Sequence, residues 1–155
     1  SKSVFKQHIM QTLMQAGYAT EMYGPLWKEL FDAKTGSCIR ACVSPDVFDT
    51  VKQVRKAGGI AVMAHPFTYN SIEVLYELID QQLLDGIEVW QSKTTCEQER
   101  FLEELADGYD LIKTGGSDFH GSYASKISPV GKGRTPQESL ERLFALKDQR
   151  NRLGS

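Results

Sequence analysis

The chain has 155 residues, 41% of them hydrophobic and 25% charged, a composition typical of one soluble domain with its own core. Its formal net charge of -2 excludes a broad cationic surface for nucleic acid or an anionic membrane, so phosphate chemistry would need metal ions or a few basic side chains. No apolar run has transmembrane length, and the polar start SKSVFKQH lacks the features of a secretory signal, which predicts a cytoplasmic protein.

Helices are predicted over the first third of the chain. The spacing of apolar residues predicts a helix from about residue 4 to Gly17, with Phe5, Ile9 and Leu13 facing the core. A second, shorter helix is predicted over residues 25–33. A third opens at SPD (44–46), with Ser44 as its N-cap, and runs to Gly58.

Three short, β-prone runs follow and are separated by helical segments. They are IAVMA (60–64), GIEVW (86–90) and YDLIKT (109–114). The intervening helices have clear start signals: Ser71, Thr94 with Glu97 as a capping box, and TP (135–136) with Glu138. The last helix, over 136–149, carries an apolar stripe made of Leu140, Leu143, Phe144 and Leu146. This alternation predicts an α/β fold with about three parallel strands.

The three cysteines give no sign of a disulfide framework or a cysteine zinc site. Cys38, Cys42 and Cys96 are odd in number and lack C-x-x-C spacing. We expect them to be reduced and mostly buried.

Polar residues follow each predicted strand at its carboxyl end, where the loops of a parallel sheet converge on one rim. They are His65 after the first run, Gln91 and Lys93 after the second, and Ser117, Asp118 and His120 after the third. Taken alone, His65 could equally be a functional residue of this rim or a structural histidine held by hydrogen bonds. Glu88, between Ile87 and Val89, would either face the interior or pair with a neighbouring helix.

The stretch TGGSDFHG (114–121) is the most informative segment. If it is extended, Asp118 and His120 point the same way and form a two-ligand clamp for Zn, Mn or Fe, while Phe119 points into the interior. A bound divalent ion would generate hydroxide and hold phosphoryl oxygens. The alternative is a turn in which Asp118 binds nearby amides and His120 is solvated.

The segments GGIAVMAHP, DGIEVW and TGGSDFHG, in this order, resemble the second half of a PHP (polymerase and histidinol phosphatase) domain. The helical stretch near His8 resembles an insert of the family's small phosphoesterases. The resemblance implies a partial, distorted TIM-like (β/α) barrel, with residues 1–45 as the insert and 46–155 as C-terminal βα units of one domain. It also implies a site of two or three metal ions that hydrolyses phosphate esters of nucleotides or small metabolites.

Residue by residue, the resemblance implies metal-binding and catalytic roles for His65, Asp118 and His120. His8 matches a histidine on the substrate side, although Lys6 and Gln7 replace the arginine and proline that normally precede it. An exposed helix-face histidine is the equal alternative for His8. Two further residues are candidate phosphate contacts, Ser117 and Arg134; their alternatives are a turn cap and a solvated loop charge.

The departures from the family pattern predict low activity. Histidines stand only at 8, 65 and 120, so the H-x-H pair of the family's first half is absent. Two or three divalent ions carry a total charge of about +4 to +6, whereas the three matched ligands supply one negative charge. This set would therefore hold one ion at most. We therefore expect a C-terminal part of a phosphoesterase that is inactive or weakly active. The alternatives are a noncatalytic remnant or interaction module, and a single-metal hydrolase.

A sheet of about three strands would expose an unpaired edge, because complete eight-stranded barrels need about 200–250 residues or more. We therefore predict a homodimer that pairs exposed edges. Sedimentation at micromolar concentration should show twice the chain mass; a monomer would contradict the prediction.

Overall fold

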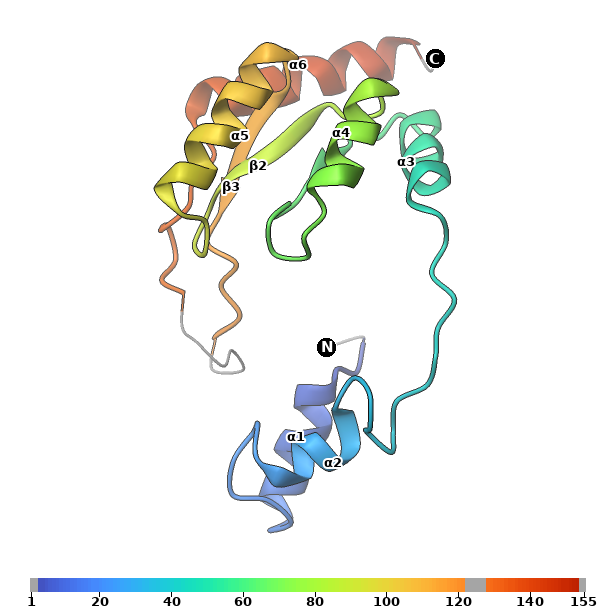
Figure 1. The fold of residues 1–155 in the computed structure, drawn as a ribbon, viewed down its shortest axis with the longest axis vertical. Coiled ribbons are helices and arrows are strands. Elements are labelled where there is room, and N and C mark those ends of the chain that lie inside the picture. The colour runs from blue at the N-terminus through green and yellow to red at the C-terminus, as the bar shows by residue number, and fades with distance from the viewer. Residues whose placement is uncertain (1–2, 122–127, 154–155) are drawn as a thin grey trace. The chain divides into compact units, whose positions relative to one another are not determined.

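The computed structural model describes residues 3–121 and 128–153. These residues form two compact units, which Figure 1 draws. The first comprises residues 3–44 with 120–121, and the second comprises 45–119 with 128–153. Whether these units correspond to an insert and a set of βα units stays a prediction.

The first unit contains two short helices, α1 (Lys6–Gln15) and α2 (Pro25–Phe31). Gly17, at φ +81, follows the end of α1, as the glycine signal predicted. The predicted core stripe was wrong, because Phe5 and Ile9 are exposed and Met10 is the fully buried residue. A unit this small has little interior, so it buries one residue of α1 rather than a stripe.

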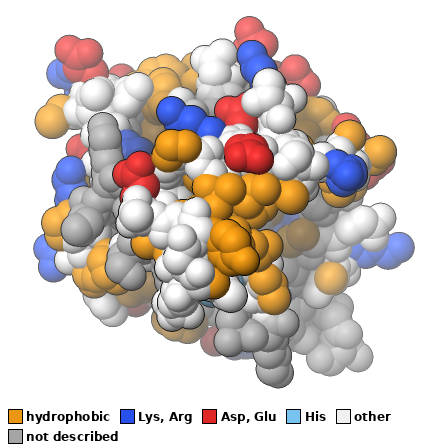
Figure 2. All heavy atoms as spheres, turned by 90° about the horizontal axis from the view of Figure 1, so that it is seen from below, with side chains coloured by type: hydrophobic (Ala, Val, Ile, Leu, Met, Phe, Trp, Pro, Cys, Tyr) orange, Lys and Arg blue, Asp and Glu red, His pale blue; other side chains and the backbone are white. Residues whose placement is uncertain are grey.

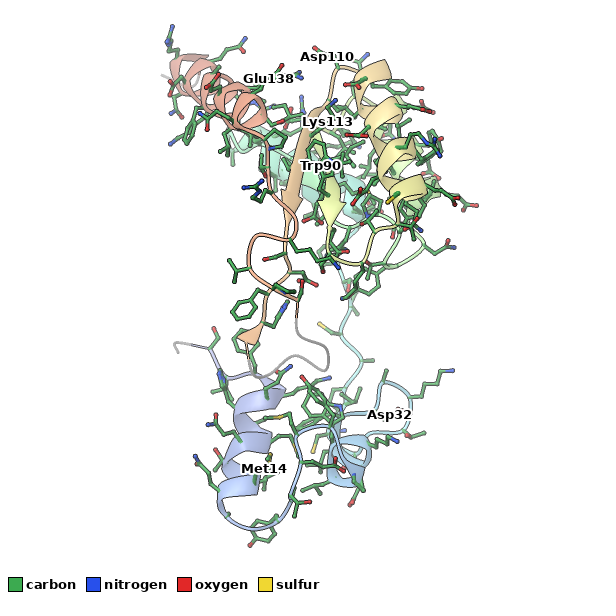
Figure 3. The ribbon with its side chains drawn as sticks, turned by 90° about the vertical axis from the view of Figure 1, so that its left-hand side faces the viewer. Met14, Asp32, Trp90, Asp110, Lys113 and Glu138 are labelled. Carbon is green, nitrogen blue, oxygen red and sulfur yellow. The ribbon has the colours of Figure 1, made fainter. Side chains whose placement is uncertain are left out.

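Helix α2 ends at Phe31, two residues before the predicted boundary, and Asp32 is its C-cap. Its carboxylate accepts hydrogen bonds from the N–H groups of Lys34 (2.9 Å) and Thr35 (3.0 Å) and from the Thr35 hydroxyl (3.0 Å). These bonds lower the pKa of Asp32 below its usual value, and the bond from the N–H of Lys34 contributes most. The resulting turn sits beside α2 in Figure 3.

All three cysteines are free and exposed, which corrects the expectation of buried thiols. Cys38 and Cys42 lie in the irregular segment after α2, and Cys96 is the first residue of a helix. None lies on a strand or a buried helix face, so none is covered.

The second unit is built on a parallel three-stranded sheet, ordered β1 (Val62–Met63), β2 (Gly86–Gln91), β3 (Ile112–Gly116). The register pairs Val62 with Gly86 and Gly86 with Ile112. Four helices accompany it: α3 (Val47–Lys56), α4 (Ile72–Asp80), α5 (Cys96–Gly108) and α6 (Gln137–Leu153). The predicted α/β class with three parallel strands is confirmed, although β1 is shorter than 60–64.

The core lies where α4 and α5 cover one face of the sheet (Figure 1). Fully or nearly fully buried side chains come from each layer: Leu75 and Leu78 of α4, Ile87 and Val89 of β2, and Leu102 and Ala106 of α5. Because Ile87 and Val89 point into this core, Glu88 between them points to the other face of the sheet.

Helices α2 and α4 begin where they were predicted, at Pro25 and after Ser71, whereas the caps of α3 and α5 differ from the predictions by one or two residues. Asp46, not Ser44, caps α3 by accepting the N–H of Asp49 at 3.0 Å. Thr95, not Thr94, caps α5, and its capping-box partner is Gln98. The predicted α6 stripe is only partly covered, because Leu140 and Phe144 are exposed while Leu143 and Leu146 are half-buried.

Two ion pairs connect β3 with the flanking helices. Lys113 of β3 pairs with Asp107 of α5 at 2.6 Å, and Arg142 of α6 pairs with Asp110 at 2.8 Å. Figure 3 labels Lys113 and Asp110, which lie near the start of β3. Exposed pairs of this kind contribute at most about 1 kcal/mol each, so they orient the helices more than they stabilise them.

Charged side chains of both signs are interspersed on the face shown in Figure 2, where hydrophobic side chains also gather. Among the described residues, no helix combines the length and apolar character that crossing a membrane requires.

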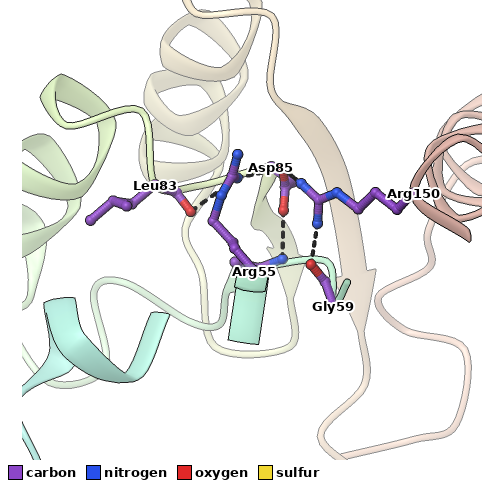
Figure 4. A network of polar contacts seen from close by, with 6 residues as sticks. Arg55, Gly59, Leu83, Asp85 and Arg150 are labelled. Carbon is purple, nitrogen blue, oxygen red and sulfur yellow. Dashed lines mark hydrogen bonds and ion pairs between the residues drawn. The ribbon is translucent and has the colours of Figure 1, made fainter. Parts of the chain in front are cut away.

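The side chain of Asp85 joins three segments at the amino ends of the strands (Figure 4). Its Oδ1 lies 2.7 Å from Arg55 Nη1 of α3 and 2.6 Å from Arg150 Nη2 of α6. Its Oδ2 accepts the N–H of Ala61 at 2.7 Å. Arg150 also donates to the carbonyl of Gly59. The Asp85 side chain is 7% exposed, so its charge is buried and compensated by two guanidinium groups.

The backbone of Asp85 joins the strands as well. Its N–H donates to Ala61 O at 2.8 Å, and its carbonyl accepts the N–H of Ile112 at 2.9 Å. One residue therefore ties the starts of all three strands to α3 and α6.

We expect Asp85→Ala to destabilise the chain by about 3–5 kcal/mol, because it leaves two arginines without their buried partner. Urea unfolding followed by circular dichroism measures the change. The matched control is Asp148→Ala, an exposed aspartate of α6, which should shift stability by less than about 0.5 kcal/mol. Equal losses in the two variants would contradict the prediction.

Candidate functional site

His65 follows β1 directly and is held by its backbone. Its N–H donates to Oε2 of Glu88 at 2.7 Å, and its φ is +33, a conformation that a residue with a side chain rarely adopts. Its ring makes an edge contact with Tyr69, with centroids 5.5 Å apart. Its Nδ1 is buried and has no hydrogen-bond partner among residues 3–121 and 128–153. A buried imidazole nitrogen without a partner is costly unless a ligand completes it.

Glu88 reaches across the carboxyl end of the sheet. Besides its bond to His65, its Oε1 lies 3.2 Å from the position that a Cβ on Gly116 would occupy. Of the two alternatives for Glu88, the structure shows the one in which it faces away from the helices, where it fixes the loop after β1. A side chain at 116 would crowd this carboxylate.

A pocket of about 260 Å³ opens beside His65 at the ends of β1 and β2. Its lining residues are His65, Phe67, Thr68, Gln91, Lys93, Thr94 and Gln98. Gln91, the last residue of β2, is only 4% exposed. Its Oε1 accepts the N–H of Lys93 at 2.9 Å, and its Nε2 is buried without a partner among the described residues.

Lys93 connects this pocket with Asp118. Its Nζ lies 3.4 Å from Oδ2 of Asp118, and the two side chains are 64% and 32% exposed. Solvent screening limits such a pair to about 1 kcal/mol or less. The structure thus brings His65 and Asp118 to the same end of the sheet, one after β1 and the other after β3, with Lys93 next to both.

The predicted extended conformation of the segment after β3 was wrong. Asp118 has φ +51, in the left-handed region, and Phe119 is 51% exposed rather than directed into the interior. Aspartate tolerates this conformation better than most residues. The argument that residues two apart share one side therefore does not apply here.

His120 and His8 belong to the first unit. His8 Nδ1 accepts the N–H of Phe5 at 3.1 Å, which caps the start of α1. Within the ranges that the structure describes, no three His, Cys, Asp or Glu side chains form a group that could hold a metal ion. The metal roles of His65, Asp118 and His120 and the substrate role of His8 stay predictions.

The segment before α6 packs against the same end of the sheet. Thr135 Oγ1 bonds both the N–H and the carbonyl of Gly115, each at 3.0 Å, and Lys132 Nζ donates to Ser92 O at 2.9 Å. Gly133 lies so close to Trp90 O that a Cβ there would clash. Arg134 is exposed beside it and Ser117 is half-buried, and their phosphate contacts stay predictions.

Sequence reasoning placed Gln91 and Lys93 at this rim but gave neither a role. The signal that could have indicated a role for Gln91 is its place at the end of a mostly apolar strand, where a polar side chain becomes buried. That its amide nitrogen lacks a partner depends on packing, and no sequence pattern shows it.

No known family model matches the chain. Over 131 residues it is 37% identical to the phosphoribosyl 1,2-cyclic phosphate 1,2-diphosphodiesterase of Eggerthella lenta, covering 84% of this chain and 49% of that protein. It is 30% identical over 121 residues to the 3',5'-nucleoside bisphosphate phosphatase of Chromobacterium violaceum, covering 76% and 42%. It is 31% identical over 126 residues to the 5'-3' exoribonuclease Rnm of Escherichia coli, covering 76% and 41%.

A solved structure resembles the fold. The crystal structure of a Bifidobacterium adolescentis protein described as a metal-dependent phosphoesterase matches with a TM-score of 0.71 and 28% sequence identity. The match covers 91% of this chain and 50% of that one. The chain spans about half the length of the relatives that it matches.

We expect Glu88→Ala to speed amide hydrogen exchange at His65 by about tenfold or more, because the N–H loses a charged acceptor. Exchange measured by NMR on the folded chain tests this. The matched control, Glu104→Ala, removes an exposed carboxylate of α5 and should leave the His65 rate unchanged. An unchanged rate in Glu88→Ala would show that the bond does not hold this loop.

Proposed function

We propose that this chain, which belongs to the PHP-type metal-dependent phosphoesterases, forms the C-terminal part of a domain that hydrolyses phosphate esters of nucleotides or small metabolites. The names of the relatives support the substrate class, since they act on a cyclic phosphate, a nucleoside bisphosphate and RNA. The observation that carries the proposal is the buried, unpartnered Nδ1 of His65 at the carboxyl end of β1.

The residues at this end of the sheet suit a divalent ion. His65 offers a neutral nitrogen and Asp118 a carboxylate, which are the ligand types preferred by transition-metal ions, and His120 would be the third ligand. When bound, such an ion polarises a phosphoryl oxygen and lowers the pKa of a water molecule. The identity of the ion, including zinc or manganese, is part of the proposal.

The chain's own residues would orient these ligands. Glu88 accepts the backbone N–H of His65 at 2.7 Å and so holds the backbone from which the imidazole ring projects. Lys93 lies 3.4 Å from Asp118 and makes a weak, solvent-screened contact with that carboxylate. Ser117, Arg134 and His8 are the proposed contacts to the phosphate.

The activity of the chain by itself should be low. The three proposed ligands carry one negative charge between them, which compensates one divalent ion at most. A noncatalytic interaction module is the second candidate, because the described residues contain no group of three metal-ligating side chains. A cytoplasmic location and the sheet-edge homodimer also remain predictions.

We expect calorimetric titration with Mn²⁺ or Zn²⁺ to show about one ion per chain, and Asp118→Ala to weaken binding by more than about tenfold. Slow hydrolysis of model phosphomonoesters and phosphodiesters, stopped by a chelator, should accompany binding. The control is Asp80→Ala, the exposed last residue of α4, which should bind normally. A chain that binds no ion would overturn the catalytic proposal and leave the interaction module.

A further inference from the structure

We propose that Gln91, Lys93 and the first turn of α5 form an anion subsite that binds a phosphoryl group of the substrate. The inference deepens the proposed function, on which the identity of the bound group rests. The subsite is the 260 Å³ pocket next to His65, and it uses residues other than the proposed metal ligands.

Gln91 supplies a hydrogen-bond donor whose direction is fixed. Because its Oε1 accepts the N–H of Lys93, the amide group cannot rotate its nitrogen away without losing that bond. The nitrogen is buried and lacks a partner in the described parts of the chain, and an unsatisfied donor of this kind is costly. Gln91 is one of the residues that line the pocket, and in the proposed subsite an acceptor oxygen of the bound group satisfies this donor, whereas a cation would be repelled.

Lys93 supplies positive charge at the mouth of the same pocket. Its ammonium is 64% exposed and is paired with Asp118 at 3.4 Å, a weak, solvent-screened contact. A phosphoryl oxygen could share the ammonium at little cost, because three donors are available on one Nζ. The overall charge of -2 makes this local cation more important for holding an anion.

The start of α5 adds its helix dipole. The helix has 13 residues, and two of the residues at its start, Thr94 and Gln98, line the pocket. The capping box bonds the N–H groups of Thr95 and Gln98, so the positive end of the dipole is well ordered. Glu97 and Glu99 lie in the same turn but are not among the pocket's lining residues.

The size of the pocket limits what it can hold. Sites for whole small-molecule ligands have volumes of about 300–1,000 Å³, and this pocket, at 260 Å³, is below that range. It therefore fits one group of a substrate, such as a phosphoryl group, with the remainder outside.

Titration of the metal-free, chelator-treated chain with inorganic phosphate, followed by ¹⁵N NMR at constant ionic strength, tests the subsite directly. We expect saturable shifts at the amides of residues 91–98. Gln91→Glu keeps the acceptor for Lys93 N–H and replaces the donor by a carboxylate oxygen, so it should weaken binding by about tenfold or more. Lys93→Met should weaken it similarly and serves if Gln91→Glu does not fold.

The matched control is Lys147→Met, which removes an exposed lysine of α6. Phosphate binding that Lys147→Met leaves intact and the two pocket variants lose supports the subsite. Shifts elsewhere, equal losses in all three variants, or no saturable binding overturn it. Because neither metal nor turnover enters this measurement, its result is separate from the test of the proposed function: phosphate binding by a chain that binds no divalent ion would leave the subsite standing and overturn the phosphoesterase proposal. Conversely, a chain that hydrolyses phosphate esters, and whose phosphate binding neither pocket variant weakens, would support the phosphoesterase proposal and overturn the subsite.

Discussion

The buried carboxylate of Asp85 is the constraint on which the second unit depends. It neutralises Arg55 and Arg150 (Figure 4), and the backbone of the same residue joins the starts of the strands. The two guanidinium groups and the N–H of Ala61 offset the desolvation of this carboxylate, whereas loss of one partner would leave an uncompensated buried charge. The network lies at the amino ends of a parallel sheet, so the carboxyl ends are left for binding and chemistry.

At the carboxyl ends the structure keeps features that do not favour stability. His65 holds a positive φ, Gln91 buries an amide nitrogen without a partner among the described residues, and Asp118 is left-handed. Each would cost free energy in an ordinary loop. Glu88 offsets part of this cost by accepting the N–H of His65. Rigid support at one end of the sheet and strained loops at the other is the arrangement expected of a functional scaffold.

The sequence was sufficient to predict the parallel α/β unit, because apolar runs and start signals are local. Helix starts were displaced where adjacent residues compete for the cap, as with Thr94 and Thr95. The inward direction of Phe119 was mispredicted, because the left-handed conformation of Asp118 breaks the alternation of an extended segment. The Asp85 network was not foreseen, since it joins residues 55, 85 and 150, and no pattern relates positions so far apart. At the site, spacing indicated His65 and Asp118 as candidates, but only packing reveals the pocket at Gln91.

The hydroxyl of Thr135 occupies both backbone groups of Gly115 and so takes the place of a neighbouring strand on β3. An edge whose donors and acceptors are already engaged there offers little to an incoming β-segment. β1, at the other end of the strand order, pairs with β2 through two residues. An incoming strand on the β3 side would therefore meet backbone groups that are already engaged where β3 reaches Gly115.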